Sequence, residues 1–122
     1  MPSAMAEHPW PSELRLSPDK ATLTVSFDNG DRFALGAEYL RVESPSAEVQ
    51  GHAAGQKQIV PGKRAVKIEA LEPVGNYAVR IRFDDGHDTG LYSWDYLHEL
   101  GRDQNKKWAA YIRELRIRKL ER

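Results

Sequence analysis

Cysteine is absent from the 122 residues of this sequence. Its absence excludes a disulfide framework, a zinc site built from thiolates, an iron–sulfur cluster held by this chain alone and a cysteine nucleophile. Long apolar runs are absent too. None approaches the roughly 20 residues that a membrane-spanning helix needs, and residues 1–10 lack the basic and apolar regions of a secretory signal. We therefore expect a cytoplasmic protein that does not contact membranes.

Catalytic motifs are also missing. The sequence has no Gly-x-Ser-x-Gly elbow, no Walker loop, no Gly-x-Gly-x-x-Gly, and no His-x-Asp or His-x-Glu triplet of the kind that begins an iron-binding facial triad. The paired carboxylates of Asp84 and Asp85 precede a glycine, in a turn where aspartate is placed for backbone reasons. The sequence thus predicts a binding domain rather than an enzyme.

An excess of charge of either sign is lacking, because 18 basic and 18 acidic residues give a formal net charge of zero. The distribution is uneven, however: residues 102–122 hold eight basic and three acidic side chains, a net charge of +5, so the rest of the chain carries −5. Such asymmetry is typical of a segment that meets an acidic partner, and a solvated helix face is the plainer alternative. Arg80 and Arg82 give one strand a basic face, but no aromatic side chain alternates with them, so we expect no nucleic-acid partner.

Alternating apolar and polar residues predict short antiparallel strands joined by tight turns. Residues 23–27 alternate in this way and lead into Asn29-Gly30, a strong hairpin signal because both residues tolerate positive φ. Residues 66–69 and 77–83 show the same alternation, and a second turn follows at Asp85-Gly86. The sequence predicts an α+β fold in which small antiparallel hairpin-based sheets are combined with short helical turns and a C-terminal helix.

One sequence pattern occurs twice, 56 residues apart. Phe-Asp-Asn-Gly at 27–30 resembles Phe-Asp-Asp-Gly at 83–86. The match extends to further positions, Leu35 with Leu91 at the same offset and Tyr39-Leu40 with Tyr96-Leu97 after one added residue. A duplication would predict two similar hairpins in one antiparallel arrangement; the alternative is a coincidence between common hairpin sequences.

Two helices are predicted near the C-terminus. Ser93 is a favourable N-cap for a short helix over residues 94–100, which Gly101 would end. Asp103 would cap a second helix over about residues 104–121.

The second predicted helix carries an apolar stripe at the spacing i, i+3, i+4, i+7, formed by Trp108, Tyr111, Ile112 and Leu115. Ile117 and Leu120 fall outside this stripe. They would contact a partner or a second protomer, or belong to a frayed helix end.

Two histidines are candidates for a site. The segment 48–63 contains several glycines, shows no clear period and carries His52; loops of this length without structure are usually functional or disordered. His87 stands next to Asp88 in the second turn, and imidazole beside carboxylates can hold a divalent metal if His52 folds back toward it. The alternative is a solvent-facing turn histidine.

Six short motifs in a fixed order carry a family resemblance. They are Tyr39-Leu40-Arg41, Ser44-Pro45-Ser46-Ala47-Glu48-Val49, Gly51-His52, Val74-Gly75-Asn76-Tyr77, Asp84-Asp85-Gly86-His87-Asp88 and Tyr92-Ser93-Trp94-Asp95-Tyr96-Leu97. Together they resemble the gamma-butyrobetaine hydroxylase-like N-terminal domain, a domain of unknown function. The likeness covers residues 14–101. It leaves a flexible, proline-containing N-terminal arm at 1–13 and a basic C-terminal helix at 102–122.

What the resemblance implies about function is limited. In the hydroxylases this domain precedes a separate oxygenase domain, and three cysteines and a histidine of the domain hold structural zinc. The matching residues here are Ser44, Ser46, Val49 and His87, and because serine is a poor zinc ligand we do not expect the same site. Related domains are appended to P-loop ATPases of iron–sulfur cluster assembly, which implies an accessory role linked to such clusters or to oxygenases.

The sequence as a whole predicts a non-catalytic binding module that contacts a protein partner. Its contact surface would comprise His52, Asp85, His87 and Trp94. The alternative is a divalent-metal site, for iron or zinc, with His52, His87 and Asp88 as ligands. No other cofactor is expected, and the C-terminal helix is the expected contact if the chain forms a homo-oligomer.

Overall fold

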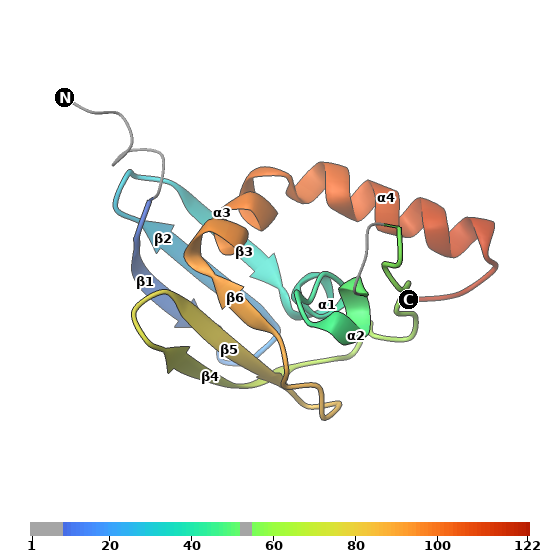
Figure 1. The fold of residues 1–122 in the computed structure, drawn as a ribbon, viewed down its shortest axis with the longest axis horizontal. Coiled ribbons are helices and arrows are strands. Elements are labelled where there is room, and N and C mark those ends of the chain that lie inside the picture. The colour runs from blue at the N-terminus through green and yellow to red at the C-terminus, as the bar shows by residue number, and fades with distance from the viewer. Residues whose placement is uncertain (1–8, 52–54) are drawn as a thin grey trace.

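The computed structural model describes residues 9–51 and 55–122 of the chain. The described residues form two three-stranded antiparallel sheets and four helices (Figure 1). The first sheet contains β1 (Pro11–Leu16), β2 (Thr22–Phe27) and β3 (Arg32–Gly36), and the second contains β4 (Ile68–Val74), β5 (Ala78–Phe83) and β6 (Leu91–Ser93). The helices are α1 (Ala37–Val42), α2 (Ala47–Gln50), α3 (Trp94–Arg102) and α4 (Gln104–Ile117). The predicted α+β class, with small antiparallel sheets and a C-terminal helix, is confirmed.

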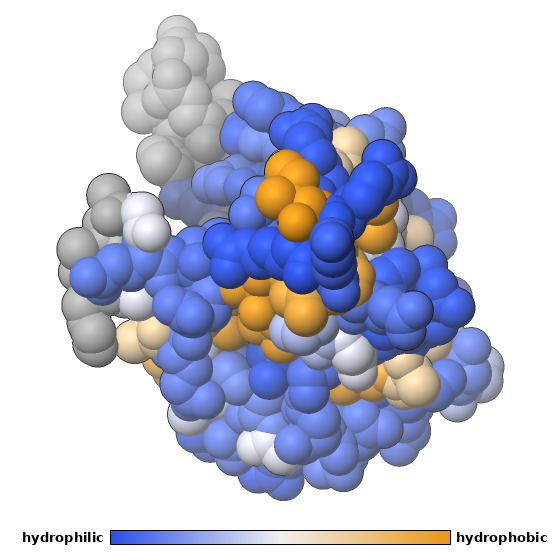
Figure 2. All heavy atoms as spheres, turned by 90° about the vertical axis from the view of Figure 1, so that its right-hand side faces the viewer, coloured by the Kyte–Doolittle hydropathy of each residue, from blue (hydrophilic) through white to orange (hydrophobic). Residues whose placement is uncertain are grey.

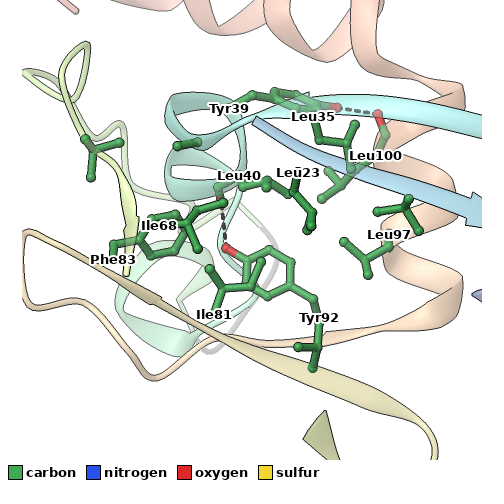
Figure 3. Packing of buried hydrophobic residues seen from close by; sticks show 14 of the residues in the cluster. Leu23, Leu35, Tyr39, Leu40, Ile68, Ile81, Phe83, Tyr92, Leu97 and Leu100 are labelled. Atoms are coloured by element: carbon green, nitrogen blue, oxygen red, sulfur yellow. Dashed lines mark hydrogen bonds between the residues drawn. The ribbon is translucent and has the colours of Figure 1, made fainter. Parts of the chain in front are cut away.

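Both sheets contribute side chains to one core. In β2 every second residue is buried, as the alternation in the sequence predicts. Figure 3 shows side chains of both sheets, α1 and α3 pointing toward one another: Leu23, Leu35, Tyr39, Leu40, Ile68, Ile81, Phe83, Tyr92, Leu97 and Leu100. Burying a large apolar side chain contributes about 1.5–3 kcal/mol. Because the cluster is shared, each sheet depends on the other for its stability.

The chain runs twice through the order strand, strand, strand, helix. β1 to β3 are followed by α1, and β4 to β6 by α3. The two predicted turns share their backbone hydrogen bonds: the amide of Gly30 donates to the carbonyl of Phe27 at 3.1 Å, and the amide of Gly86 donates to that of Phe83 at 3.1 Å. Both glycines have positive φ, +96° and +91°, which explains why glycine occupies both positions. The two similar hairpins are therefore present, but they lie in two separate sheets and not in one antiparallel arrangement.

Relative to the first half, the second half contains one extra residue. The sequence match places this residue after Leu91, whereas the strand register places it before Tyr92. Thr22 pairs with Gly36 in the first sheet, and Ala78 pairs with Ser93 in the second. Leu35 is consequently equivalent to Tyr92, at an offset of 57, and the match of Leu35 with Leu91 is wrong. Leu35 and Tyr92 are both fully buried, whereas Leu91 is 43% exposed. A one-residue shift in a strand turns a side chain to the opposite face.

Two equivalent tyrosines join the halves reciprocally. Tyr39 of α1 donates its hydroxyl hydrogen to the backbone carbonyl of Leu100, near the end of α3, at 2.7 Å. Tyr96 of α3 donates to the carbonyl of Glu43, the residue that follows α1. Carbonyls at a helix end lack partners within the helix. Each half therefore completes the hydrogen bonding of the other half's helix.

Gly101 lies inside α3 and does not end it, so the predicted helix end is wrong. The helix continues to Arg102. A Cβ atom at position 101 would lie 2.2 Å from the ring of Phe33 in β3, so glycine is present because the aromatic ring packs directly on the helix backbone. Asp103 occupies the predicted N-cap of α4, but its carboxylate pairs with Arg102 at 3.1 Å and does not cap the helix.

The predicted apolar stripe of α4 faces the body of the protein. Tyr111 and Leu115 are buried against Val42, with Trp108 and Ile112 partly buried beside them. The Tyr111 hydroxyl donates to a backbone carbonyl of the preceding loop at 2.7 Å, and burial raises the pKa of this hydroxyl to about 12. The C-terminal helix is thus packed against the loop between α2 and β4.

The chain turns back on itself after α4, which ends at Ile117 and not at about residue 121 as predicted. Lys119 has a φ of +58°, and the amide of Leu120 donates to the carbonyl of Leu115 at 2.8 Å. Arg122 then reaches Glu38 of α1, with hydrogen bonds of 2.8 and 3.1 Å to the two carboxylate oxygens. The end of the chain is held against α1, and the frayed-end interpretation is wrong.

The N-terminal arm is shorter than predicted. Residues 11–13 belong to β1, which pairs with β2, although two prolines flank Trp10. Proline is tolerated at the first residue of an edge strand because no hydrogen bond is needed from its nitrogen.

No helix among residues 9–51 and 55–122 is long and apolar enough to cross a membrane.

Candidate functional site

His87, the central residue of both predicted sites, is buried and does not face solvent. His87 lies in the second hairpin turn, after β5, and is only 7% exposed. Its Nε2 atom lies 2.9 Å from the hydroxyl oxygen of Ser44 and 3.4 Å from that of Ser46. Both serines follow α1 and are themselves buried. The second turn is therefore joined to the end of the first half's helix by a polar cluster.

The surroundings of His87 favour the neutral imidazole. Burial lowers the pKa of His87, and the positive charge of Arg41 lowers it further, against opposing contributions from Glu48, Asp85 and Asp88. The carboxylate of Glu48 lies 3.6 Å from Nδ1. A neutral ring can accept one hydrogen bond and donate another, which suits a position between a hydroxyl group and a carboxylate.

Asp85 is held within the molecule by two cations. Arg41 of α1 donates to its carboxylate at 2.8 Å, and Lys63 lies 2.7 Å from the same oxygen. The backbone amide of His87 donates to the other carboxylate oxygen at 3.0 Å. Burial alone would raise the pKa of Asp85, but these hydrogen bonds outweigh it and lower the pKa to about 2. Asp85 joins α1, the loop before β4 and the second turn, so its carboxylate is already occupied.

The residues present do not fit the structural zinc that the family resemblance implies. Ser44, Ser46 and His87 come together as the family pattern requires, and Val49 is buried next to Gln50 at the end of α2. Two neutral hydroxyls and a valine replace three thiolates, however, and zinc sites use thiolate, imidazole or carboxylate ligands. Here hydroxyl–imidazole hydrogen bonds join the two segments.

The predicted metal site at His52, His87 and Asp88 is described only in part, because His52 lies outside the described residues. Across residues 9–51 and 55–122, no three histidine or acidic side chains are grouped closely enough to hold a metal ion. Metal binding through His52 therefore stays a prediction.

The two arginines of the basic strand face of β5 share one acidic partner within the fold. Arg80 and Arg82 both pair with Glu72 of the neighbouring strand β4, at 2.9 and 3.2 Å. This pairing agrees with a solvated sheet face and offsets one of the two positive charges.

Trp94, the remaining residue of the predicted contact surface, lies in an aromatic hollow. Trp10, Tyr77 and Trp94 line a concavity of about 250 Å³, with Pro9, Ser93 and Asp95 completing its wall. Trp10 is 48% exposed and Tyr77 is 55% exposed. We call these three side chains the aromatic surface. The alternation of residues 77–83 assigned Tyr77 to the buried face, which is wrong, because β5 starts only at Ala78.

Hydrogen bonds fix the residues of the aromatic surface. The indole N–H of Trp94 donates to the carbonyl of Asn76 at 2.8 Å. The amide of Trp10 donates to the carboxylate of Asp28 at 3.2 Å, and the amide of Asp28 donates back to the carbonyl of Trp10 at 2.8 Å. The backbone amide of Trp94 donates a hydrogen bond to the carbonyl of Tyr77 at 3.2 Å. The hollow therefore exists before any partner arrives.

Comparison with known proteins identifies relatives without a stated function. The family model described as gamma-butyrobetaine hydroxylase-like, N-terminal, matches residues 14–98. Two proteins whose solution structures were solved by NMR share 48% and 44% identity, both with a TM-score of 0.82; the matches cover 100% and 94% of this chain and 89% and 90% of theirs. A crystal structure of a DUF971-family protein of unknown function from Acidithiobacillus ferrooxidans shares 38% identity, with a TM-score of 0.63, over 75% of this chain and 91% of that one. No curated protein matches.

Proposed function

We propose that this chain, which belongs to the gamma-butyrobetaine hydroxylase-like N-terminal family, is a non-catalytic accessory module that binds a protein partner through its aromatic surface. The observation that carries the proposal is one hollow lined by the exposed rings of Trp10 and Tyr77 and by the partly buried ring of Trp94. Tryptophan and tyrosine are the residues most enriched among those that dominate binding energy at protein interfaces. Because hydrogen bonds already fix this hollow, little ordering of the free protein opposes binding.

The charge beside the hollow indicates the kind of segment that would bind. The carboxylates of Asp28 and Asp95 stand next to Trp10 and Trp94 in the fold. A segment with apolar side chains and a neighbouring lysine or arginine complements this arrangement, through burial and cation–π contacts with the rings. The family resemblance suggests oxygenases or ATPases of iron–sulfur cluster assembly as the proteins that carry such a segment.

Affinity capture followed by direct binding tests the proposal. The chain is immobilised, the retained protein is identified and purified, and its affinity is measured with wild type and with Trp94→Ala. We expect at least about a 30-fold loss, because truncating an interface tryptophan that dominates binding costs about 2 kcal/mol or more. Circular dichroism verifies that the variant is folded.

Ile117→Ala is the matched control, since Ile117 is 65% exposed on α4 and does not line the hollow. It should leave the affinity unchanged. Equal losses for the two variants, or no loss for Trp94→Ala and Trp10→Ala, would show that the aromatic surface is not the contact.

A further inference from the structure

The end of α4 and the residues that follow it form a second hollow, remote in sequence from the aromatic surface. Its volume is about 440 Å³, within the roughly 300–1,000 Å³ of typical ligand sites. Its apolar wall consists of Ile112 and Leu115 of α4 and of Leu120. Figure 2 looks onto the side of the molecule where α4 ends and shows hydrophobic residues gathered between hydrophilic ones. We call this feature the C-terminal groove.

The walls of the C-terminal groove are fixed by contacts on both sides. The amide of Gly62 donates to the carbonyl of Glu121 at 2.9 Å, which ties the final residues to the loop before β4. Arg122 is held by Glu38 and lies over the ring of Trp108, with 5.3 Å between the guanidinium carbon and the ring centroid. The groove is thus a preformed feature and not a gap beside a loose end.

The charge around the groove is positive and incompletely balanced. Arg64 and Arg116 line it from two different segments, and neither has a carboxylate within ion-pair distance in the described part of the chain. Arg122 is neutralised by Glu38, and Glu121 is the acidic side chain in the lining. Two arginines remain available on an apolar wall.

Arginine at such a position favours carboxylates. Its planar guanidinium can donate two parallel hydrogen bonds to one carboxylate. A groove with an apolar wall and a charged rim is suited to an amphipathic helix, whose apolar side chains at i, i+3, i+4 and i+7 project together. We propose that the C-terminal groove binds an acidic amphipathic helix of a partner protein, with its apolar face on Ile112 and Leu120 and its carboxylates on Arg64 and Arg116.

A second copy of this chain is a poorer occupant. The chain outside residues 102–122 carries the compensating negative charge, but many of its carboxylates are already paired, as Glu43 is with Lys57 and Glu72 is with Arg80. The groove and the aromatic surface have no lining residue in common. Variants can therefore test the two proposed binding surfaces independently.

The probe for the groove is a fluorescent 14-residue peptide with leucines at i, i+3, i+4, i+7 and glutamates elsewhere. Anisotropy measures its binding to the full chain. We expect saturable binding that Arg116→Glu or Arg64→Glu weakens at least about tenfold, because each replaces an attraction with a repulsion. Amide chemical shifts should change for residues around Leu115 and Leu120.

Lys106→Glu is the matched control, because it makes the same change of charge on the same helix outside the groove lining. It should weaken the peptide by much less than Arg116→Glu. A peptide with serine in place of leucine should not bind, and Trp94→Ala should leave binding unchanged.

Four outcomes would overturn the proposal. The first is equal weakening by Lys106→Glu and Arg116→Glu, which would indicate attraction by overall charge alone. The second is self-association in sedimentation that Arg116→Glu abolishes, which would assign the groove to a second copy. The third is no binding of the glutamate peptide. The fourth is binding of a DNA oligomer of equal charge at the same affinity.

Discussion

The two hairpin turns, residues 28–31 and 84–87, have the same backbone hydrogen bonds and opposite surroundings. In the first, the carboxylate of Asp31 lies at the surface, 2.7 Å from His98 of α3. In the second, the equivalent residue is His87, which is buried against Ser44. Each turn contacts the helix of the other half. The two turns therefore share a backbone, but only the second turn takes part in a buried polar cluster.

A pair of equivalent packing contacts explains how the second half accommodates this cluster. Phe33 of the first half lies against Gly101 of the second half. The equivalent contact is between Gly90 of the second half and Ser44, which follows α1 in the first half; a Cβ on Gly90 would lie 2.5 Å from the serine oxygen. An aromatic ring meets a glycine at the first contact, and a glycine meets a serine at the second. Where the first half has an aromatic ring, the second has a glycine and room for polar side chains.

The comparison would be altered most by placing thiolates in the polar cluster that joins His87 of the second turn to the segment after α1. A Ser44→Cys/Ser46→Cys/Val49→Cys variant should bind Zn²⁺ together with His87, because three thiolates and an imidazole form a common structural zinc site. At free zinc about 1,000-fold above Kd the gain in folding free energy is about 4 kcal/mol. Thermal unfolding with and without zinc measures it.

His87→Ala in the triple-cysteine background is the control and should remove the stabilisation. The wild-type chain, titrated with Zn²⁺ and Fe²⁺ in the same experiment, tests the predicted site at His52, His87 and Asp88. Wild-type binding that His87→Ala leaves intact would contradict that site. A triple variant without any zinc-dependent shift would show that the three positions do not converge on His87.

Filling the glycine position that faces Phe33 should destabilise the fold by about 2 kcal/mol. Gly101→Val would place a side chain in the ring of Phe33, and overpacking of a core typically costs about 1–3 kcal/mol, which the better helix propensity of valine relative to glycine offsets only in part. Urea unfolding gives the free energy. The double variant Phe33→Ala/Gly101→Val should lose less than the sum of the single losses, because the steric conflict is gone; additive losses would refute the direct contact.

Removing either reciprocal hydroxyl should cost about 1 kcal/mol, and the two costs should match. Tyr39→Phe and Tyr96→Phe each leave one helix-end carbonyl without its donor while the ring packing is kept. The free energies of unfolding of the two variants, each compared with wild type, show whether the two costs match. A difference between them of more than about 1 kcal/mol would mean that the two bonds are equivalent in geometry only.

The smallest expected effect is a pH dependence that belongs to the second half. The pKa of His87 is lowered in the folded chain, so the unfolded chain binds a proton more readily. The stability contributed by the neutral ring is complete above the unfolded pKa of about 6.5 and is lost as the pH falls below it. Urea unfolding between pH 7.5 and 5 should show this loss in wild type, relative to His87→Gln, and parallel curves would contradict it.

Much of the fold could be predicted because its signals are local. Alternation identifies β2 and β5, two Asx-Gly pairs identify the turns, and the spacing of Trp108 to Leu115 identifies the packed face of α4. β1 was missed because proline dominates the segment and the pairing of residue 14 with residue 25 is not local.

The candidate site was predicted less well because burial depends on contacts between distant segments. The residues of an Asp-rich turn suggest a histidine in solvent, and the family resemblance, not any local pattern, grouped His87 with Ser44, which lies 43 residues earlier. Gly101 resembles a helix terminator until Phe33 is seen packed against it. Tyr77 begins an alternating run in the sequence, but it lies in the turn before β5 and its side chain is exposed. In each case the deciding neighbour lies in another part of the chain.

The reciprocal tyrosines mean that neither repeat is self-sufficient. A chain cut near Gly55 would give two fragments. In each fragment, a carbonyl near the end of the helix would lack the tyrosine hydroxyl that the other fragment donates to it. Mixed in solution, such fragments should reassemble into one particle, and either fragment alone should stay unstructured. The two halves would then behave as an obligate dimer whose subunits share one chain.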